Sequence, residues 1–249
     1  MLQRLLTRMG MSLGVAVLLA ALAAAPANAQ SPTPEGTVIR SIATVSFTDA
    51  NSNTYATVAD TADVTVGFVA GVDVIARAAT VGPASPSSND TLFFTVANPG
   101  NGTDSVTISQ LIGPGTIITV TGYRVGVITY PSLALLNAAL AGTAITQGTN
   151  IVVKVIYNVA SGTGGLSQTY TLTATSRRNT GVSDNGVTTV SPNLTTAVSV
   201  SPDGLQNLTR LPSNGTTYTA NFTVTNNASG ADGFDLLVTH PRTAITIIS

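Results

Sequence analysis

Apolar and small polar residues alternate along ten stretches of the chain, most of them with Thr or Ser between Val, Ile, Tyr or Phe. This two-residue period turns one face of each stretch toward a core and is typical of β-strands. Segments rich in Gly, Asn and Asp separate the stretches and favour tight turns. The expected strands are 37–47, 62–74, 91–98, 104–112, 116–130, 150–159, 168–176, 195–202, 218–226 and 234–240. Short strands at this spacing predict an all-β fold of antiparallel sandwiches.

One segment, 131–142, departs from the two-residue period. Its Leu133, Leu136 and Leu140 stand at helical spacing. Pro131 and Gly142 bound the segment, and these residue types favour the start and the end of a helix. We therefore expect a short helical insert near 131–141 that packs its leucines on the sandwich. A lid or a partner-binding helix is the alternative.

The chain repeats part of itself with an offset of 128 residues. "FTVANPGNGTDSV", from Phe94, and "FTVTNNASGADGF", from Phe222, share Phe, Thr, Val, Asn, Gly and Asp in the same order. A weaker echo relates the strands before the first copy to those before the second. These echoes predict tandem sandwich repeats, as in long exported chains. The predicted parts are the closing strands of one unit (30–69), a complete unit (70–198) and the opening strands of another (199–249).

The apolar segment 243–249 stands without an encoded partner strand. An uncovered edge strand favours aggregation. We therefore expect either that the sequence is part of a longer chain, or that its final strands pair with a neighbouring repeat or protomer, as in donor-strand assembly.

The amino terminus has the composition of an export signal. Arg4 and Arg8 precede the apolar run 10–25, and Ala27 and Ala29 supply the small residues that signal peptidase requires. We expect a signal-peptide helix over 1–29, removed before Gln30. Because the run is shorter than the roughly 20 residues that span a bilayer, no membrane insertion is expected after cleavage. The expected location is extracellular or at the cell surface, with the periplasm as the alternative.

Charge and cysteine content exclude several classes of protein. With Arg4 and Arg8 removed, 8 basic residues remain against 11 acidic ones, a net charge of −3. So weak a charge predicts no nucleic-acid partner and no attachment to anionic lipid. The chain has no cysteine, so burial in a core, rather than disulfides, must stabilise it.

Residues that could perform catalysis are scarce. His240 is the only histidine and Glu35 the only glutamate, whereas a catalytic triad needs a histidine beside a serine and glycosidases need paired acids. A zinc site needs several His or Cys ligands. The glycines of 161–165 are followed by neither Lys nor a helix, so they predict a flexible hairpin turn and not a phosphate loop. We predict no enzyme activity and no catalytic, cofactor-binding or metal-binding residue.

The stretch "TDANSNTY" (48–55) places oxygen-bearing side chains at alternate positions, as a calcium loop does. These residues are Asp49, Asn51 and Asn53. The sixth and twelfth positions, however, carry Thr54 and Asp60 in place of the Gly and Glu of an EF-hand, and strands flank the stretch. A hairpin turn is therefore predicted. Weak calcium binding at 49–53, at a junction between domains, is the alternative.

Several segments together carry a family resemblance: "GTVIRSIATVSFTDANSNTY", "FFTVANPGNGTDSVTIS", "VVKVIYNVASGTGG", "YTLTATS" and "SPDGLQNLTRLPSNGTTYTANFTVTNNASGADGF". They resemble the immunoglobulin-like conserved repeat, a domain of unknown function in large bacterial cell-wall and outer-membrane-associated proteins. The resemblance implies tandem immunoglobulin-like sandwiches and a non-catalytic structural or spacer role at the cell surface. An adhesin-like module that recognises extracellular glycan or protein through loops or edge strands is the alternative. Tyr123 and Tyr130 are the aromatic residues to inspect for such binding, or else a cross-strand pair.

Overall fold

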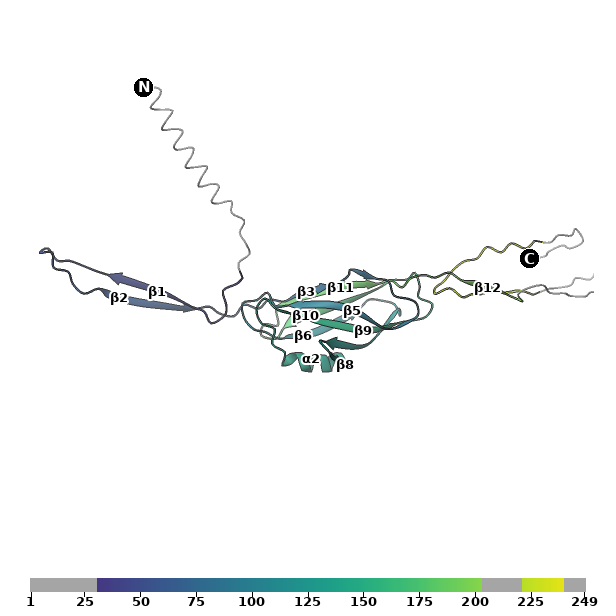
Figure 1. The fold of residues 1–249 in the computed structure, drawn as a ribbon, viewed down its shortest axis with the longest axis horizontal. Coiled ribbons are helices and arrows are strands. Elements are labelled where there is room, and N and C mark those ends of the chain that lie inside the picture. The colour runs from purple at the N-terminus through teal and green to yellow at the C-terminus, as the bar shows by residue number, and fades with distance from the viewer. Residues whose placement is uncertain (1–30, 203–220, 240–249) are drawn as a thin grey trace, which may run out of the picture. The chain divides into compact units, whose positions relative to one another are not determined.

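The computed structural model describes residues 31–202 and 221–239. Strands dominate these ranges, and one short helix accompanies them (Figure 1). The chain divides into two compact units between Val66 and Gly67. The predicted signal-peptide helix over 1–29 and His240 lie outside the described residues.

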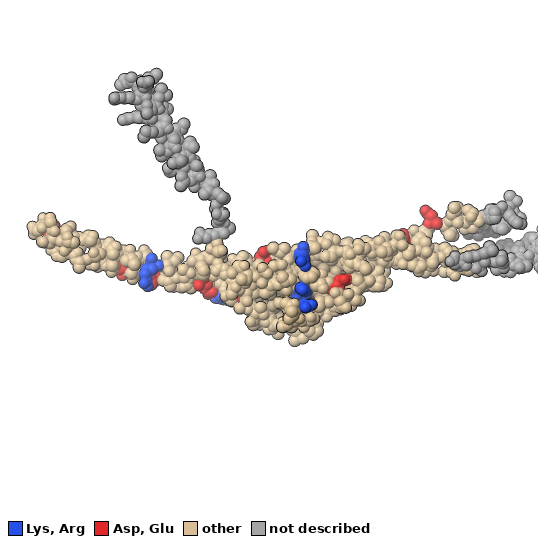
Figure 2. All heavy atoms as spheres, in the orientation of Figure 1, with Lys and Arg blue, Asp and Glu red and all other residues tan. Residues whose placement is uncertain are grey.

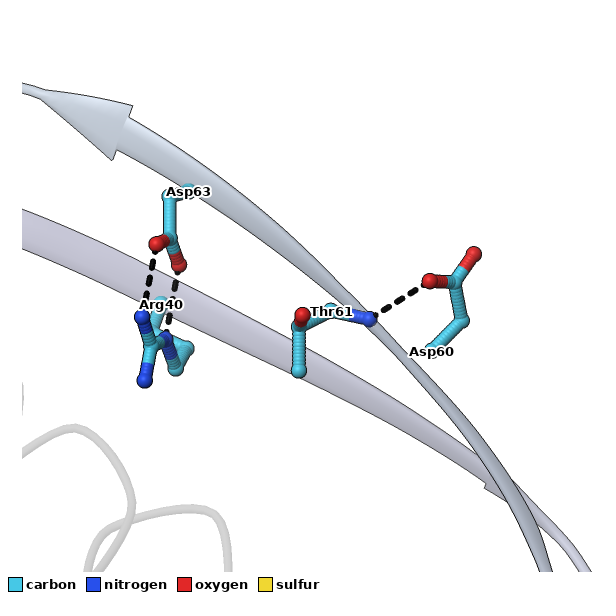
Figure 3. A network of polar contacts seen from close by, with 4 residues as sticks. All are labelled: Arg40, Asp60, Thr61 and Asp63. Atoms are coloured by element: carbon cyan, nitrogen blue, oxygen red, sulfur yellow. Dashed lines mark hydrogen bonds and ion pairs between the residues drawn. The ribbon is translucent and has the colours of Figure 1, made fainter.

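The first unit contains one antiparallel hairpin. Its strands are β1 (Val38–Val45) and β2 (Val58–Thr65), which pair from Val38 opposite Thr65 to Val45 opposite Val58. Every residue of both strands is exposed. The side chains of one face are mostly small and apolar, whereas the other face carries an ion pair between Arg40 and Asp63 (Figure 3).

Two sheets of the second unit form a sandwich. The first sheet is fully antiparallel in the order β3 (Asp73–Ala76), β5 (Ser87–Ala97), β9 (Asn150–Val159), β7 (Ile118–Val125), β8 (Ile128–Tyr130). The second has the order β4 (Thr80–Val81), β11 (Ser183–Val190), β10 (Gln168–Ser176), β6 (Val106–Ile112). In the second sheet, only β4 runs parallel to its neighbour.

Alternate side chains from both sheets fill one core, as the two-residue period predicts. Phe94 of the first sheet packs against Tyr170 of the second, with ring centroids 5.8 Å apart. A Cβ at Gly186 would lie 3.1 Å from side-chain atoms of Val74 and Phe94, so glycine lets the sheets approach closely there. The predicted all-β antiparallel fold is confirmed.

The predicted helix is confirmed as α2 (Leu133–Ala141). Ser132 caps its amino end by accepting a hydrogen bond from the N–H of Leu135, and Leu136 and Leu140 are buried. The helix packs mainly on β6, which is an edge strand. The side chain of Asn137 accepts from the N–H of Ile108 at 2.7 Å and donates to its carbonyl at 2.8 Å. No helix in the described ranges is long and apolar enough to cross a membrane.

Two predicted strands are each divided in the structure. The expected strand 62–74 covers the end of β2 and the start of β3, and 66–72 between them has no ladder. That segment instead bonds to the side chain of Asn101. The expected strand 116–130 is a hairpin, because Gly126 turns the chain with φ +58°.

Other differences follow from tertiary pairing. Strand β11 was not predicted because its Asp-Asn-Gly sequence (184–186) is typical of turns, but pairing with β10 holds it extended. The short β4 was missed because its two residues are too few to show a two-residue period, and it is defined only by its pairing with β11. Among the residues described near the carboxyl end, 198–202 and 221–239, the strands that pair are β12 (Val198–Ser201) and β13 (Thr223–Asn226). The described part of the predicted strand 234–240 forms no ladder, so this prediction is wrong for 234–239.

Adjacent leucines of α2 provide a test of the core. Leu136 is 0% exposed and Leu135 is 52% exposed. We expect Leu136→Ala to lower the free energy of unfolding by about 2–5 kcal/mol, because it leaves a cavity. Leu135→Ala should change it by less than about 0.5 kcal/mol. Denaturant unfolding measures both, and equal losses would contradict the packing of α2 on the sandwich.

Candidate functional site

Residues 48–55 form the tip of the β1–β2 hairpin. Thr48 and Thr54 bridge the two arms, and the N–H of Asp49 donates to the carbonyl of Asn53 at 3.1 Å. Ser52 turns the chain with φ +67°. The stretch is therefore a hairpin turn, as predicted.

The carboxylate of Asp49 organises this turn. One oxygen accepts from the N–H groups of Asn51 and Asn53, each at 2.9 Å. The other accepts from Asn53 Nδ2 at 2.9 Å and from the Tyr55 hydroxyl at 3.0 Å. These bonds, led by the side chain of Asn53, hold the pKa of Asp49 below its usual value. The Tyr55 ring stacks on Phe47 with centroids 4.8 Å apart.

Weak calcium binding at this turn stays the alternative that the sequence offers. In the ranges that the structure describes, no group of three or more His, Cys, Asp or Glu side chains could hold a metal ion. The Asp49 oxygens already accept four hydrogen bonds. A bound calcium ion would have to replace these donors.

Carboxyl NMR tests the role of Asp49. We expect its pKa to lie below the usual value of about 3.9 and to rise toward it in Asn53→Ala, which removes the largest cause of the shift. Because the pKa is lowered by folding, the turn should lose its stabilisation as pH falls through that pKa. Calcium should leave the Asp49 signal unchanged at neutral pH. A calcium-dependent shift, absent for Asp235, would instead establish the metal site.

The two tyrosines that the sequence offered for binding belong to the sandwich. Tyr123 and Tyr130 are a cross-strand pair on β7 and β8. Tyr123 is buried, and its hydroxyl and that of Tyr170 each donate to Gln110 Oε1 at 2.6 Å. Burial raises the pKa of Tyr123 and of Tyr170. Packing, and not display at a loop, is therefore the role of Tyr123.

Three cations and a phenylalanine form a row across the outer face of the first sheet, which we call the basic-aromatic row. Phe93 lies opposite Lys154, and Lys154 lies opposite Arg124. Arg77 follows β3 and donates its N–H to the Phe93 carbonyl. The Arg77 guanidinium carbon and Lys154 Nζ lie 4.8 and 5.3 Å from the centroid of the Phe93 ring. The ring thus holds two cations close together.

The row borders a hollow of about 730 Å³. Its apolar lining includes Ile75, Val125 and Val152. In the described ranges no carboxylate forms an ion pair with Arg77, Arg124 or Lys154. Most of the surface in Figure 2 carries neither Lys or Arg nor Asp or Glu, which makes this cluster unusual for the chain.

Sequence reasoning did not find the basic-aromatic row. Its members come from four separate segments, and only the strand register brings them together. The available signal was their position in the two-residue period: Phe93 and Lys154 stand between buried residues on their strands, so they must face outward.

A turn network recurs in the two copies of the repeated motif. The side chain of Asn98 donates to the carbonyl of Gly102 at 2.9 Å and accepts from the N–H of Gly100 at 2.9 Å. At 128 residues further along, Asn226 makes the same two bonds at 3.1 and 2.8 Å. Its partners are Gly230 and Ala228.

In each copy of the motif, a second side chain forms hydrogen bonds to the segment that precedes the first strand of that repeat. Asn101 holds the segment 67–69, accepting an N–H at 2.7 Å and donating to a carbonyl at 2.8 Å. Ser229 holds the segment 193–195 in the same way, at 2.8 and 3.0 Å. The sequence repeat is therefore also a repeat of geometry.

Ser229 also joins the second copy of the motif to the end of the sandwich that the four- and five-stranded sheets form, which we call the complete sandwich. Its carbonyl accepts from the N–H of Gly164 at 2.8 Å and from the Ser85 hydroxyl at 3.2 Å. A Cβ at Gly164 would collide with the Ser229 hydroxyl. The segment 161–165 is a turn, with positive φ at Gly162 and Gly165. The prediction of a hairpin turn there is wrong, because the segment connects β9 and β10, which lie in different sheets, and it forms part of this junction.

Comparisons with known proteins identify no family. No protein-family model matches the sequence, and no curated protein matches it. A solved structure with a match is the crystal structure of BcpA*(D312A), the major pilin subunit of Bacillus cereus, at 10% identity and a TM-score of 0.25. The match covers 64% of this chain, which spans half of the length of that pilin. The resemblance to the immunoglobulin-like conserved repeat stays a prediction.

Proposed function

We propose that the chain is an exported, non-catalytic structural module of the cell surface, in which sandwich repeats are joined end to end as a spacer. The observation that carries this proposal is the junction, where the turn network of the second repeat is bonded to the end of the complete sandwich. A spacer must keep successive domains at a fixed separation, and directional bonds across a junction do this.

The connector between the repeats supports the same function. Between β11 and β12 the N–H groups of Ser191 and Asn193 donate to carbonyls of Val81 and Pro83, each at 2.9 Å. The Asn193 side chain donates to Gly82 at 2.7 Å. The connector is thus bonded along its length, whereas a flexible linker is free in solution.

Distance measurements between spin labels test the spacer. The chain has no cysteine, so Thr107→Cys and Thr225→Cys provide two exposed labelling sites, one on each side of the junction. We expect a single narrow distance distribution. Gly164→Ala should broaden it, because the new methyl group would collide with Ser229.

Gly233→Ala is the control for this measurement, because a Cβ there meets nothing within 4 Å. It should leave the distribution narrow. A broad distribution in the unsubstituted chain would contradict the spacer function.

A second candidate function is binding of an anionic polymer at the basic-aromatic row. Neighbouring strands lie about 4.8 Å apart. The row therefore places Lys154 and Arg124 on adjacent strands, with Arg77 on the other side of Phe93. The three cations lack carboxylate partners in the described ranges, and the hollow beside them is largely apolar. This arrangement favours a carboxylated glycan over a neutral one.

Binding of polygalacturonate, compared with neutral dextran, tests this candidate. We expect Lys154→Ala and Arg124→Ala each to weaken binding about two- to fivefold, as exposed ion pairs do, and added salt to weaken it further. Arg40→Ala removes the same charge from the other unit and should have no effect. Equal effects of all three substitutions would exclude a site at the row.

A further inference from the structure

We propose that hairpin β1–β2 of one copy and the opening segments 198–202 and 221–239 of a second copy combine into one sandwich, so that copies of the chain join head to tail. The proposal deepens the proposed structural function by naming the partner of the module as another copy of itself. It is argued from the complete sandwich, which contains a counterpart of each half already packed together.

In the complete sandwich the closing hairpin β10–β11 covers the opening hairpin β3–β5. Asp184 of β11 accepts from the N–H of Val74 at 2.7 Å. The Thr188 hydroxyl donates to the carbonyl of Ala78, also at 2.7 Å. Tyr170 packs on Phe94 between the sheets. An opening hairpin in this chain is therefore buried by a closing hairpin.

Hairpin β1–β2 is the counterpart of β10–β11. The carbonyls of Gly67 and Asn193 accept hydrogen bonds from equivalent partners, the side chains of Asn101 and Ser229. This equivalence sets an offset of 126 residues between β2 and β11. The strand registers then set an offset of 129 between β1 and β10. By this alignment the inner face of β1–β2 is made of Ile39, Ser41, Ala43, Val45, Val58, Asp60, Ala62 and Val64.

That inner face is the mostly apolar face of the hairpin. Val45 is 61% exposed and Val64 63% exposed. Asp60, at the place of Gly186, is its one charged residue and pairs with Ala43. Because a Cβ at Gly186 would lie 3.1 Å from side-chain atoms of Val74 and Phe94, the joined sheets must lie further apart at Asp60 than in the complete sandwich. The Arg40–Asp63 ion pair lies on the opposite face, where the alignment places solvent (Figure 3).

The segments 198–202 and 221–239 supply the other half. Val200 and Val224 are paired as Val74 and Val96 are in the complete sandwich. They line a hollow of about 510 Å³ together with Phe234. Leu236, which corresponds to Ile108 of the core, is 72% exposed. The inner face of this half is therefore apolar and open.

The missing ladder at 234–239 is explained by the same alignment. Its counterpart β6 is a strand because it pairs with β10. The counterpart of β10 is β1, which has no partner on that edge in the described ranges. Transferring the β6–β10 register places Leu236 opposite Val45 and Leu237 opposite Thr44.

Paired differences between the two halves support the match. In the complete sandwich Tyr170 donates its hydroxyl to Gln110. At the corresponding places stand Ser41, which has no phenol, and Val238, which needs no donor. The phenol and the amide that it bonds are thus absent together, although they lie in different halves. Val238 therefore leaves no buried amide oxygen without the donor that Tyr170 supplies in the complete sandwich.

Disulfide trapping tests the assembly. Thr44→Cys and Leu237→Cys occupy the places of Thr173 and Ser109, which are direct neighbours across β10 and β6. After the two purified single variants are mixed and oxidised, we expect the mixed disulfide as the main product, identified by mass spectrometry. Ala59→Cys is the matched control, because it pairs with Thr44 and lies one strand further away. Two strand spacings, about 9–10 Å, exceed the reach of a disulfide.

Equal trapping of Leu237→Cys with Thr44→Cys and with Ala59→Cys would overturn the proposal, because it would indicate random collision. A chain with both Thr44→Cys and Leu237→Cys that links only to itself, at every concentration, would also overturn it.

Association measured by sedimentation provides a second test that does not depend on cysteines. Val45→Asp puts a charge on the inner face of β1 and Val38→Asp puts one on the outer face, and both residues are exposed in the single chain. We expect Val45→Asp to weaken self-association at least tenfold and Val38→Asp to leave it unchanged. Equal effects, or no self-association of the unsubstituted chain, would overturn the proposal. Neither result bears on the spin-label distances of the spacer, which are measured within one chain.

Discussion

A β-hairpin of this chain has one apolar face, and a two-stranded hairpin alone buries too little of it to be stable in water. The complete sandwich solves this constraint by laying a closing hairpin over an opening hairpin, with Phe94 against Tyr170 at the centre. The other features depend on that arrangement. Helix α2 covers the edge strand β6, and the turn around Asn98 and Asn101 fixes where the next strands begin. Where only half of the arrangement is present, as in β1–β2, every strand residue is exposed.

The alternation of apolar and polar residues correctly predicted the strands for which the local sequence and the pairing with neighbouring strands favour the same structure. The bounds of β9 and β10 match the predicted strands, because both lie within a sheet and alternate cleanly between buried and less buried positions. Strand β11 was invisible because its turn-forming residues are held extended by a partner distant in sequence. The segment 234–239 shows the reverse case, since its apolar pattern is that of a strand but its partner is missing in the described ranges. Whether these two segments form strands therefore depends on the presence of a pairing partner as well as on their own sequence.

The candidate sites differ in how far sequence could find them. The turn around Asp49 is local, so its residue types sufficed to predict it, and the hydrogen bonds account for why Asp and Asn stand there. The basic-aromatic row depends on three strand registers, which no local pattern contains. For the junction at Ser229, the sequence showed only that the motif containing this residue is repeated. Its bonds to Gly164 and Ser85 needed the fold.

Asn137 of α2 occupies both hydrogen-bonding groups of Ile108 on the free edge of β6. Arg177 takes the carbonyl of Val106 on the same edge. The other outermost strands of the two sheets, β3, β4 and β8, are only four, two and three residues long. A crowded layer of such sandwiches thus has little exposed backbone through which neighbours could fuse sideways. The complete sandwich is thus protected from sideways pairing by its covered and short edges, although few charges keep its copies apart.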